Sequence, residues 1–424
     1  MTSKRLIVSL PGREVGELVQ SRQGLVSWIP DAAWERDGQE PRLGLDFLRK
    51  RGVRSHASEL PSWFENLLPE RESKLRLRLS AAHGLREGQS FDLLQALGHD
   101  LTGAVEARAT DDSRLRADEA ASAKPTPGET SDLSASAATG ESIRFSALTG
   151  MQLKFSMSMV NERLVLLARG RVSQWIVKLP GRDYDELAEV ETSTMTWAKR
   201  VGFEVPEHFT IPFERLDGLP AGWADGVAPA FAVRRFDRRD DGSKIHQEDL
   251  CQALDLRPRN KYGNEGPRVG FEGALRLVYD VCGEGDGREM ARRIGFMIAS
   301  GNTDAHLKNW GLLWGDRTRP TLAPCYDLVS TIAWDDMGWQ RSRGPELALH
   351  LGGESLFARI DEAALDVFAD TSGCSWAKNE IIAGIERSRD AWASFGGTVP
   401  TRMCKALEKH WASVPLLARM GPLP

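Results

Sequence analysis

The sequence has few cysteines and no pattern that would let them hold a metal. Its 5 cysteines are odd in number and far apart, so neither a CxxC pair nor a zinc-knuckle spacing occurs. We expect all of them to be reduced, small and mostly buried side chains, as is usual in a reducing compartment.

Long apolar runs and an excess of positive charge are also missing. No run approaches the ~20 apolar residues that span a bilayer, and the stretch 6–10 is too short for the core of a signal peptide. Lys and Arg number 55 against 60 Asp and Glu, a formal net charge of -5. Such a chain has no global field that draws it onto nucleic acid or anionic lipid. We therefore expect a cytoplasmic protein that does not bind membranes.

The remaining composition is that of a globular protein. Of the 424 residues, 41% are hydrophobic and 27% charged, which at this length predicts two or three domains. Residues 109–141 contain no aromatic side chain and are rich in Ala, Ser, Thr, Asp, Glu and Pro, a composition typical of a flexible linker. We therefore divide the chain into an N-terminal subdomain (1–108), this linker (109–141), a β-rich lobe (142–237) and a helical lobe (238–424).

Hydrophobic patterning predicts both strands and helices, so the expected fold class is α+β. The predicted strands are 6–10, 25–29, 154–160, 163–168, 175–179 and 230–236, with a hairpin formed by 310–314 and 321–325. The predicted helices are 60–68, 91–97 with Ser90 as N-cap, 184–201 ending before Gly202, 273–281, 288–299 and 402–413.

One loop carries the residue types that phosphoryl transfer requires. Asp304 and Asn309 are five positions apart after a predicted helix, the spacing of the catalytic loop of protein kinases, and Asp327 follows the predicted hairpin. A carboxylate such as Asp304 can accept the proton of a hydroxyl, while Asn309 and Asp327 offer oxygen ligands to Mg²⁺. Lys308 is close enough in sequence to stabilise charge on the transferred group. The alternative is that both aspartates cap turns.

Two features upstream fit the same chemistry. Lys178 is the one cation of an apolar strand, and such a lysine needs a partner, for which Glu191 is our choice over Glu189. An edge-strand lysine that reaches water is the alternative. The segment 146–154 around Gly150 is neither a Walker A sequence nor a GxGxxG loop, so it is a weak signal for phosphate binding.

Several stretches together resemble the HipA family of serine/threonine kinases, the toxins of bacterial toxin–antitoxin pairs. The stretches are 64–70, 91–103, 149–156, 175–180, 233–238, 247–254, 301–313 and 322–331, and they occur in the family's order. The resemblance implies an N-terminal subdomain followed by a bilobal protein-kinase-like fold that uses ATP with Mg²⁺.

The resemblance also implies roles for individual residues. Asp304 corresponds to the catalytic base, and Asn309 and Asp327 correspond to metal ligands. The residues implied to bind or surround the nucleotide are Lys178, Gly150, Gln152, Lys154, Glu191, Arg235, Phe236, Gln247, His306 and Tyr326. A purely structural role for His306 stays open.

Family members phosphorylate a protein serine, recurrently on an aminoacyl-tRNA synthetase, which arrests translation and growth. Their usual partner is a small helix-turn-helix antitoxin of the HipB type, through which any contact with DNA would be made. In one respect this chain departs from the family: Ala147 stands where the autophosphorylated serine is expected. Ser146 and Thr149 are the neighbouring hydroxyls that could be modified instead.

Two other functions remain compatible with the same residues. The chain could be a catalytically weak kinase fold that acts in an antitoxin–operator repressor complex, or a phosphotransferase for small molecules. ATP turnover separates the first alternative from a kinase, and the chemical nature of the labelled product separates the second.

Overall fold

The computed structural model describes residues 3–57, 59–71, 73–110, 153–166, 173–179, 184, 186–219, 228–264, 268–315, 318–337, 344–395 and 399–424. The chain divides into two compact units. Unit 1 comprises Met1–Gly181, Ile211–Glu248 and Gln252–Pro258, and unit 2 comprises Arg182–Thr210, Asp249–Cys251 and Arg259–Pro424. Most of the predicted linker, and Ser146, Thr149, Gly150 and Gln152, lie outside the described residues.

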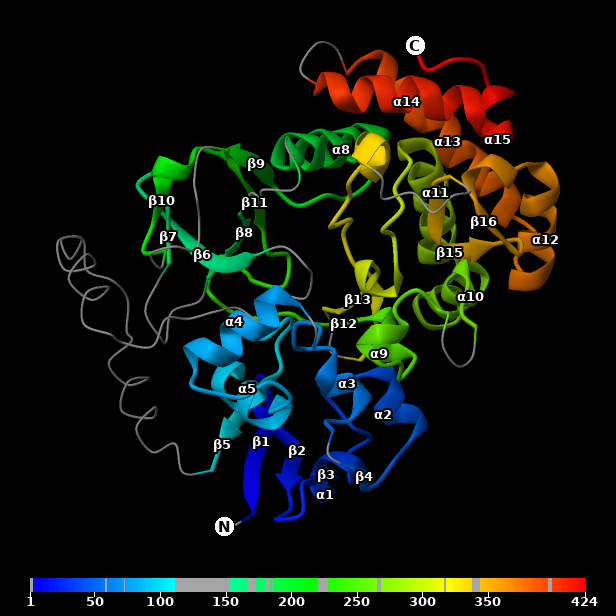
Figure 1. The fold of residues 1–424 in the computed structure, drawn as a ribbon. Helices are drawn as coiled ribbons and strands as arrows, with labels where there is room; N and C mark the ends of the chain where they lie inside the picture. The colour runs from blue at the N-terminus through cyan, green and yellow to red at the C-terminus, as the bar shows by residue number, and fades with distance from the viewer. Residues whose placement is uncertain are drawn as a thin grey trace. The chain divides into compact units, whose positions relative to one another are not determined.

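The first part of unit 1 is an antiparallel sheet with short helices (Figure 1). Its strands are β1 (Lys4–Leu10), β2 (Arg13–Gln20), β3 (Leu25–Pro30), β4 (Arg54–Ala57) and β5 (Glu106–Ala109), in the order β4-β3-β2-β1-β5. Its helices are α1 (Ala32–Arg36), α2 (Leu45–Arg49), α3 (Ser62–Glu65), α4 (Lys74–Ala82) and α5 (Ser90–Leu97). The strands predicted at 6–10 and 25–29 are confirmed, because alternate residues of β1 and β3 face the core.

Aromatic side chains fill the core of this part. Trp28 contacts Trp34, Phe47 and Phe64 at centroid distances of 6.5, 5.4 and 5.3 Å. Ser90 is the first residue of α5 and not its N-cap, which corrects our prediction. Its hydroxyl instead accepts a hydrogen bond from Arg76 at 2.7 Å.

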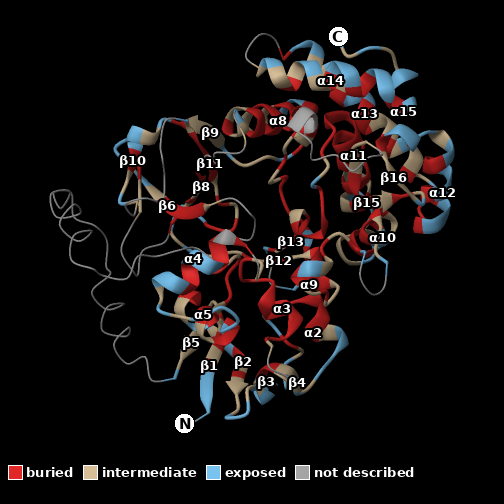
Figure 2. Cartoon of the chain, viewed as in Figure 1, coloured by how far each residue is buried: buried red, intermediate tan, exposed pale blue. Residues whose placement is uncertain are grey.

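A second sheet forms the rest of unit 1. Its strands β10 (Leu216–Asp217), β7 (Arg163–Val165), β6 (Lys154–Val160), β8 (Trp175–Lys178) and β11 (Ala230–Arg234) are neighbours in that order. The strands predicted at 154–160, 175–179 and 230–236 are confirmed, and Figure 2 shows β6 and β8 largely buried. Short strands β9 (His208–Ile211) and β12 (His246–Asp249) and helix α9 (Leu250–Ala253) cross the sequence boundaries of the two units.

Unit 2 is mainly helical. Its helices are α8 (Leu187–Val201), α10 (Phe271–Cys282), α11 (Glu284–Ser300), α12 (Glu362–Ser372), α13 (Ala377–Ala393), α14 (Thr401–Ser413) and α15 (Pro415–Ala418). Two hairpins, β13 (Gly311–Trp314) with β14 (Thr321–Leu322) and β15 (Glu346–Leu351) with β16 (Glu354–Leu356), complete it. The 3₁₀ turns of the chain are η1 (Phe213–Arg215), η2 (Pro258–Asn260), η3 (Leu307–Asn309), η4 (Thr331–Met337) and η5 (Phe357–Arg359).

Helices α11 and α13 form the centre of this unit. A Cβ atom on Gly295 of α11 would collide with the carbonyl of Ile381, and one on Gly384 of α13 would collide with that of Arg292, so glycine permits the close approach of the two backbones. Helix α8 packs against α13, where the indole of Trp197 donates to the Ser388 carbonyl at 2.8 Å.

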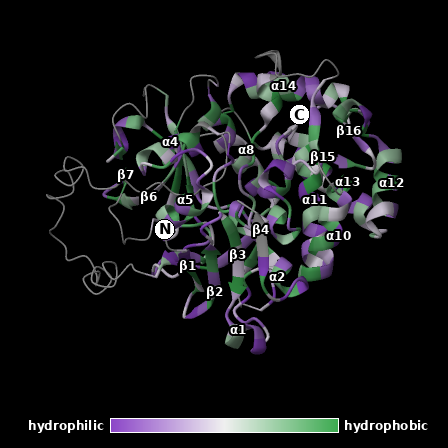
Figure 3. Ribbon diagram, turned by 60° about the horizontal axis from the view of Figure 1, so that its bottom comes forward, coloured by the Kyte–Doolittle hydropathy of each residue, from purple (hydrophilic) through white to green (hydrophobic). Residues whose placement is uncertain are grey.

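The sequence predictions for unit 2 hold in type and differ at element ends. Helix α8 begins at Leu187, after Glu186 at φ 61°, and ends before Gly202 at φ 101°, as predicted from the glycine. Helix α14 mixes hydrophilic and hydrophobic residues along its length (Figure 3), and Met403, Leu407 and Trp411 form its buried side. All five cysteines are free, as expected. Among the described residues, none of the helices combines the length and apolarity needed to cross a membrane.

Candidate active site

The loop that follows α11 in unit 2 begins at Gly301, a position where only glycine fits. Gly301 adopts φ 61°, and a Cβ atom there would collide with the side chain of Ile332. Asn302 then folds the loop, because its Oδ1 accepts from the Asp304 N–H at 2.8 Å. The predicted catalytic segment is therefore a tight turn directly after the helix.

Asp304 presents an oriented carboxylate. Its side chain is 52% exposed, and Oδ1 accepts a hydrogen bond from the Tyr262 hydroxyl at 2.9 Å. The Asp304 carbonyl accepts from the Asn309 side-chain amide at 2.7 Å. A general base requires such a carboxylate: fixed in direction, with one oxygen accessible to a substrate hydroxyl.

The same hydrogen bond orients Asn309. A carbonyl can only accept, so the NH₂ group of Asn309 faces Asp304, and the amide oxygen points away from it. That oxygen is available as a hard ligand for a cation.

His306 is buried beside Asp304. Its Nε2 lies 3.8 Å from Asp304 Oδ1, and its ring meets that of Tyr262 edge-on at 5.3 Å. Burial lowers the pKa of His306 to about 4, so the imidazole is neutral near pH 7 and forms no ion pair with Asp304. Nδ1 is buried and has no hydrogen-bond partner among the described residues, which makes it a position where a ligand atom could bind.

Lys308 and Tyr326 form buried contacts that hold the loop in place. The Lys308 ammonium is buried and lies 2.9 Å from Asp249 Oδ2, while the Tyr326 hydroxyl donates to the Lys308 carbonyl at 3.1 Å. Burial, and then the carboxylates of Asp249 and Asp327, raise the pKa of Tyr326 well above its usual range, so the phenol stays protonated. The Lys308 side chain thus has a structural partner, and its role in charge stabilisation stays a prediction.

Asp327 adopts φ 54°, a left-handed conformation that non-glycine residues rarely take. Backbone conformations of this kind cluster at functional sites. Four residues later Thr331 returns to the catalytic loop, where its hydroxyl oxygen accepts from the Thr303 N–H at 2.7 Å. The segment after Asp327 and the loop before Asp304 are therefore tied together within unit 2.

In unit 1, two predicted nucleotide-binding lysines lie directly opposite each other. The register of β6 and β8 pairs Lys154 with Lys178, and both side chains are buried, at 7% and 4% exposure. Lys178 Nζ lies 5.3 Å from the centre of the Phe231 ring. The two predicted phosphate-binding lysines are therefore neighbours on adjacent strands, and their role in binding phosphate stays a prediction.

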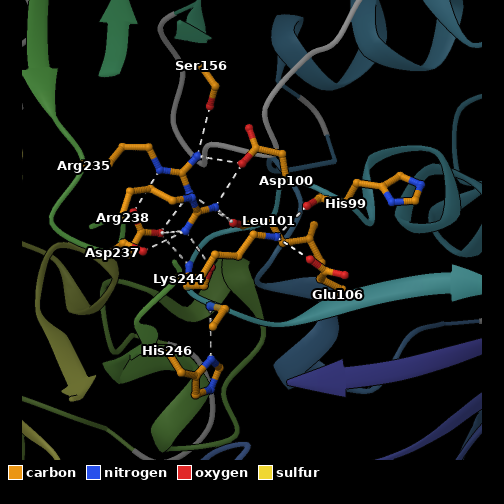
Figure 4. Close-up of polar contacts among 12 residues, drawn as sticks. His99, Asp100, Leu101, Glu106, Ser156, Arg235, Asp237, Arg238, Lys244 and His246 are labelled. Carbon is orange, nitrogen blue, oxygen red and sulfur yellow. Dashed lines mark hydrogen bonds and ion pairs between the residues drawn. The ribbon is translucent and has the colours of Figure 1, made fainter. Parts of the chain in front are cut away.

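The guanidinium of Arg235, a predicted nucleotide-binding residue, is hydrogen-bonded within unit 1. All five N–H groups of its guanidinium are used: Nε and Nη2 on Asp237 at 2.9 and 2.8 Å, Nη1 on Asp100 and Ser156 at 3.0 and 3.1 Å, and Nη2 on the Leu101 carbonyl at 3.1 Å (Figure 4). The side chain therefore belongs to the core of unit 1, while a contact of Arg235 with the nucleotide stays a prediction.

The surrounding cluster, which we call the ion cluster, consists of Asp100, Arg235, Asp237 and Arg238. Arg238 lies 2.9 Å from both Asp100 and Asp237. Burial alone would raise the pKa of Asp237, but the two guanidinium groups and the Gly103 N–H lower it far below its usual range. The cluster joins the segment after α5 to the segment after β11.

The other predicted nucleotide residues can be placed only within their own units. Phe236 and Gln247 are half-buried in unit 1, and Gln247 Oε1 has no hydrogen-bond partner among the described residues. Gln247 lies against Gly103, where a Cβ atom would be 2.8 Å from the Gln247 nitrogen. Glu191 is buried on α8 in unit 2.

The donor set fits Mg²⁺ that arrives with phosphates. The described residues contain no group of three or more His, Cys, Asp and Glu side chains that could hold a metal unaided. Mg²⁺ is commonly held by one or two protein oxygens and completed by water and phosphate, so Asn309 and Asp327 would suffice.

Sequence reasoning missed several residues that shape this loop. Tyr262, Asn302 and Thr331 contact it directly, and none belongs to the DxxxxN pattern. Asn302, next to Gly301 in a turn, could have been found from its tendency to bond its own backbone. Tyr262 carried no local signal, since its partner is 42 positions away.

Comparisons with known proteins show the fold class and the family of this chain. The fold is of the α+β, kinase-like class. A family model described as "HipA-like C-terminal domain" matches residues 146–392, and one described as "HipA N-terminal domain" matches residues 6–108. The chain therefore belongs to the HipA family.

Its relatives include two proteins of Sinorhizobium fredii that are named as candidate kinases. Y4dM is 34% identical over 78% of this chain and 78% of its own length, and Y4mE is 31% identical over 88% and 87%. The "Serine/threonine-protein kinase toxin HipA" of Shewanella oneidensis is 27% identical over 78% of this chain and 75% of its own.

A solved structure shows the same fold. It is the complex of HipA, HipB and operator DNA from Shewanella oneidensis, with a TM-score of 0.70 and 22% identity, covering 98% of this chain and 96% of that one.

Proposed function

We propose that this chain is an ATP- and Mg²⁺-dependent serine/threonine protein kinase. The observation that carries the proposal is the arrangement around Asp304. Its half-exposed carboxylate accepts a hydrogen bond from Tyr262, its backbone N–H donates to Asn302, and its carbonyl accepts from the NH₂ group of Asn309, whose amide oxygen points away. Family membership and the names of the relatives support the same reaction.

In the proposed reaction each group has one task. Asp304 accepts the proton of a serine or threonine hydroxyl, whose oxygen bonds to the γ-phosphorus of ATP while the bond to the β-phosphate oxygen breaks and ADP leaves. Asn309 and Asp327 would hold Mg²⁺, which would neutralise charge on the phosphates. Lys178 and Lys154 bind phosphate oxygens, and Lys308 adds positive charge near the transferred group. His306 Nδ1, Tyr326, Glu191, Phe236 and Gln247 help to bind the nucleotide, together with Gly150 and Gln152.

We propose a bacterial protein as substrate, and an aminoacyl-tRNA synthetase in particular, because that is the recurrent target that the resemblance implies. We also propose a HipB-like antitoxin as partner. The support is the Shewanella oneidensis complex, in which HipA is assembled with HipB and operator DNA. Any contact of this chain with DNA would be through that partner.

Transfer of labelled phosphate tests the function. The purified chain is incubated with Mg²⁺, γ-labelled ATP and a bacterial lysate, beside the variant Asp327→Ala. We expect labelled protein bands with the wild-type chain and at least about a hundredfold less label with the variant, because one cation ligand is lost. Label found only in metabolites, or ATP left unconsumed by the wild-type chain, contradicts the proposal. Mass analysis of the chain itself shows whether Ser146 or Thr149 gains phosphate.

A further inference from the structure

The last turn of α11 is held by side chains from distant parts of unit 2. An α-helix leaves its last four carbonyls without intrahelical partners, and in α11 these are Met297, Ile298, Ala299 and Ser300. The turn itself supplies two backbone donors: the N–H of Asn302 bonds to the Met297 carbonyl at 3.1 Å, and the N–H of Gly301 bonds to the Ile298 carbonyl at 3.3 Å. The three carbonyls other than that of Met297 also receive side-chain donors.

Two of these donors are consecutive residues of α14. His410 Nε2 lies 2.7 Å from the Ile298 carbonyl, and the indole N–H of Trp411 donates to the Ala299 carbonyl at 2.9 Å. The third donor is the Ser330 hydroxyl, 2.7 Å from the Ser300 carbonyl. A carbonyl only accepts, so His410 carries its proton on Nε2 in this contact.

Helix α14 also packs against η4, the turn that follows Asp327. His410 and Trp411 are buried, and the His410 ring meets Phe357 edge-on at 4.8 Å. One helix thus contacts both the backbone before Asp304 and the turn after Asp327. It lies beyond residues 146–392, the part of the chain that the C-terminal family model matches.

We propose that His410 and Trp411 are positioning residues of the catalytic loop, which act by fixing the last carbonyls of α11. A tight turn joins Ser300 to Asp304, and the hydrogen bond from the Asp304 N–H to Asn302 fixes its backbone. A rotation of the helix end therefore displaces the Asp304 carboxylate. Displacements of about 1 Å in a catalytic group can cost on the order of a hundredfold in rate. The proposal rests on the proposed function and assigns α14 a part in it.

The test compares two tryptophans that make the same bond. Trp411→Phe keeps an aromatic ring and removes one indole donor from a 2.9 Å bond to a carbonyl. Trp34→Phe is the matched control: the Trp34 indole is buried in unit 1 and donates to the Pro41 carbonyl at 2.9 Å, on helix α1, which carries no proposed site residue. The thermal unfolding midpoint of each variant is measured first, and activity is assayed well below both midpoints. A difference in activity then does not reflect a difference in stability.

We expect Trp411→Phe to lower kcat about tenfold or more with KM for ATP changed by less than about twofold, and Trp34→Phe to leave both near the wild-type values. His410→Gln retains a donor at the position of Nε2 and should keep most of kcat, whereas His410→Phe should lose it. Equal kcat in Trp411→Phe and Trp34→Phe, or wild-type kcat in His410→Phe, overturns the proposal.

Hydrogen–deuterium exchange keeps this test independent of the proposed function. If the wild-type chain transfers no phosphate, the kinase proposal fails, but exchange of residues 301–309 still reports on the loop. Faster exchange there in Trp411→Phe than in Trp34→Phe supports the positioning role, and equal exchange contradicts it.

Discussion

The two units hold their key segments with different kinds of bonds. In unit 1 the ion cluster of Asp100, Arg235, Asp237 and Arg238 joins two segments far apart in sequence with buried charges. In unit 2 the end of α11 is held by neutral donors on backbone carbonyls. Burying a charge has a large desolvation cost, and removing its partner leaves an uncompensated charge that destabilises the fold strongly. Burying a neutral hydrogen-bonding group costs less, and the loss of one such bond lowers the free energy of unfolding by a smaller amount.

The difference bears on what each segment does. The ion cluster includes Arg235, which precedes the half-buried Phe236, and its ion pairs hold this stretch of unit 1 in place. The end of α11 precedes a loop whose proposed carboxylate must work beside phosphates. The neutral donors fix the helix end before this loop and add no charge of their own there.

The largest effect is expected from Asp237→Asn. The substitution keeps the shape of the side chain but leaves two buried guanidinium groups with Asp100 as the remaining carboxylate of the cluster, so we expect a loss of about 3–5 kcal/mol in the free energy of unfolding. Urea unfolding followed by tryptophan fluorescence measures it. The control is Asp217→Asn, in the exposed pair with Arg163, which should leave the midpoint unchanged. A wild-type midpoint in Asp237→Asn would show that the cluster adds no stability.

An intermediate effect is expected from the pH dependence of His410. Burial lowers its pKa from 6.5 to about 4, so the unfolded chain takes up a proton at this residue before the folded chain does. The contribution of neutral His410 to the free energy of unfolding is therefore fully present above pH 6.5. It falls by up to about 3 kcal/mol as the pH drops to about 4. In His410→Gln the unfolding free energy should fall less steeply with pH over this window, because unfolding then takes up one proton fewer. An unchanged slope would mean that His410 stays exposed to solvent protons when folded.

The smallest effect is expected from Ser330→Ala. It removes one neutral donor from the Ser300 carbonyl, and we expect a loss of about 1–2 kcal/mol in the free energy of unfolding. Ser394→Ala is the control, because the Ser394 hydroxyl bonds the Ala391 carbonyl at an exposed position where water can replace it. If Ser330→Ala costs as much as Asp237→Asn, the contrast between the two units does not hold.

Much of the fold could be predicted because it depends on local patterns. Strands such as β6 and β8 follow from apolar residues between polar turns, and the end of α8 follows from Gly202. Asp304 and Asn309 could be predicted as a pair because the loop that joins them is short, and their hydrogen bond lies within it.

What escaped prediction depends on partners far along the chain. Nothing near Arg235 indicates that Asp100, 135 positions earlier, will take up its guanidinium. In the same way the helix over 402–413 could be predicted from its periodicity, but not the two carbonyls of α11, 112 positions away, that its His410 and Trp411 bind. Such bonds arise from tertiary packing, which periodicity does not encode.

The most direct test of the account is phosphate transfer by Asp304→Asn. The amide keeps the size of the side chain and can still accept from Tyr262, but it cannot take a proton from a hydroxyl. We predict that this variant binds Mg-ATP with an affinity close to wild type and transfers labelled phosphate to protein at least about a hundredfold more slowly. Transfer at the wild-type rate would contradict the assignment of Asp304 as the base, and with it the proposed mechanism.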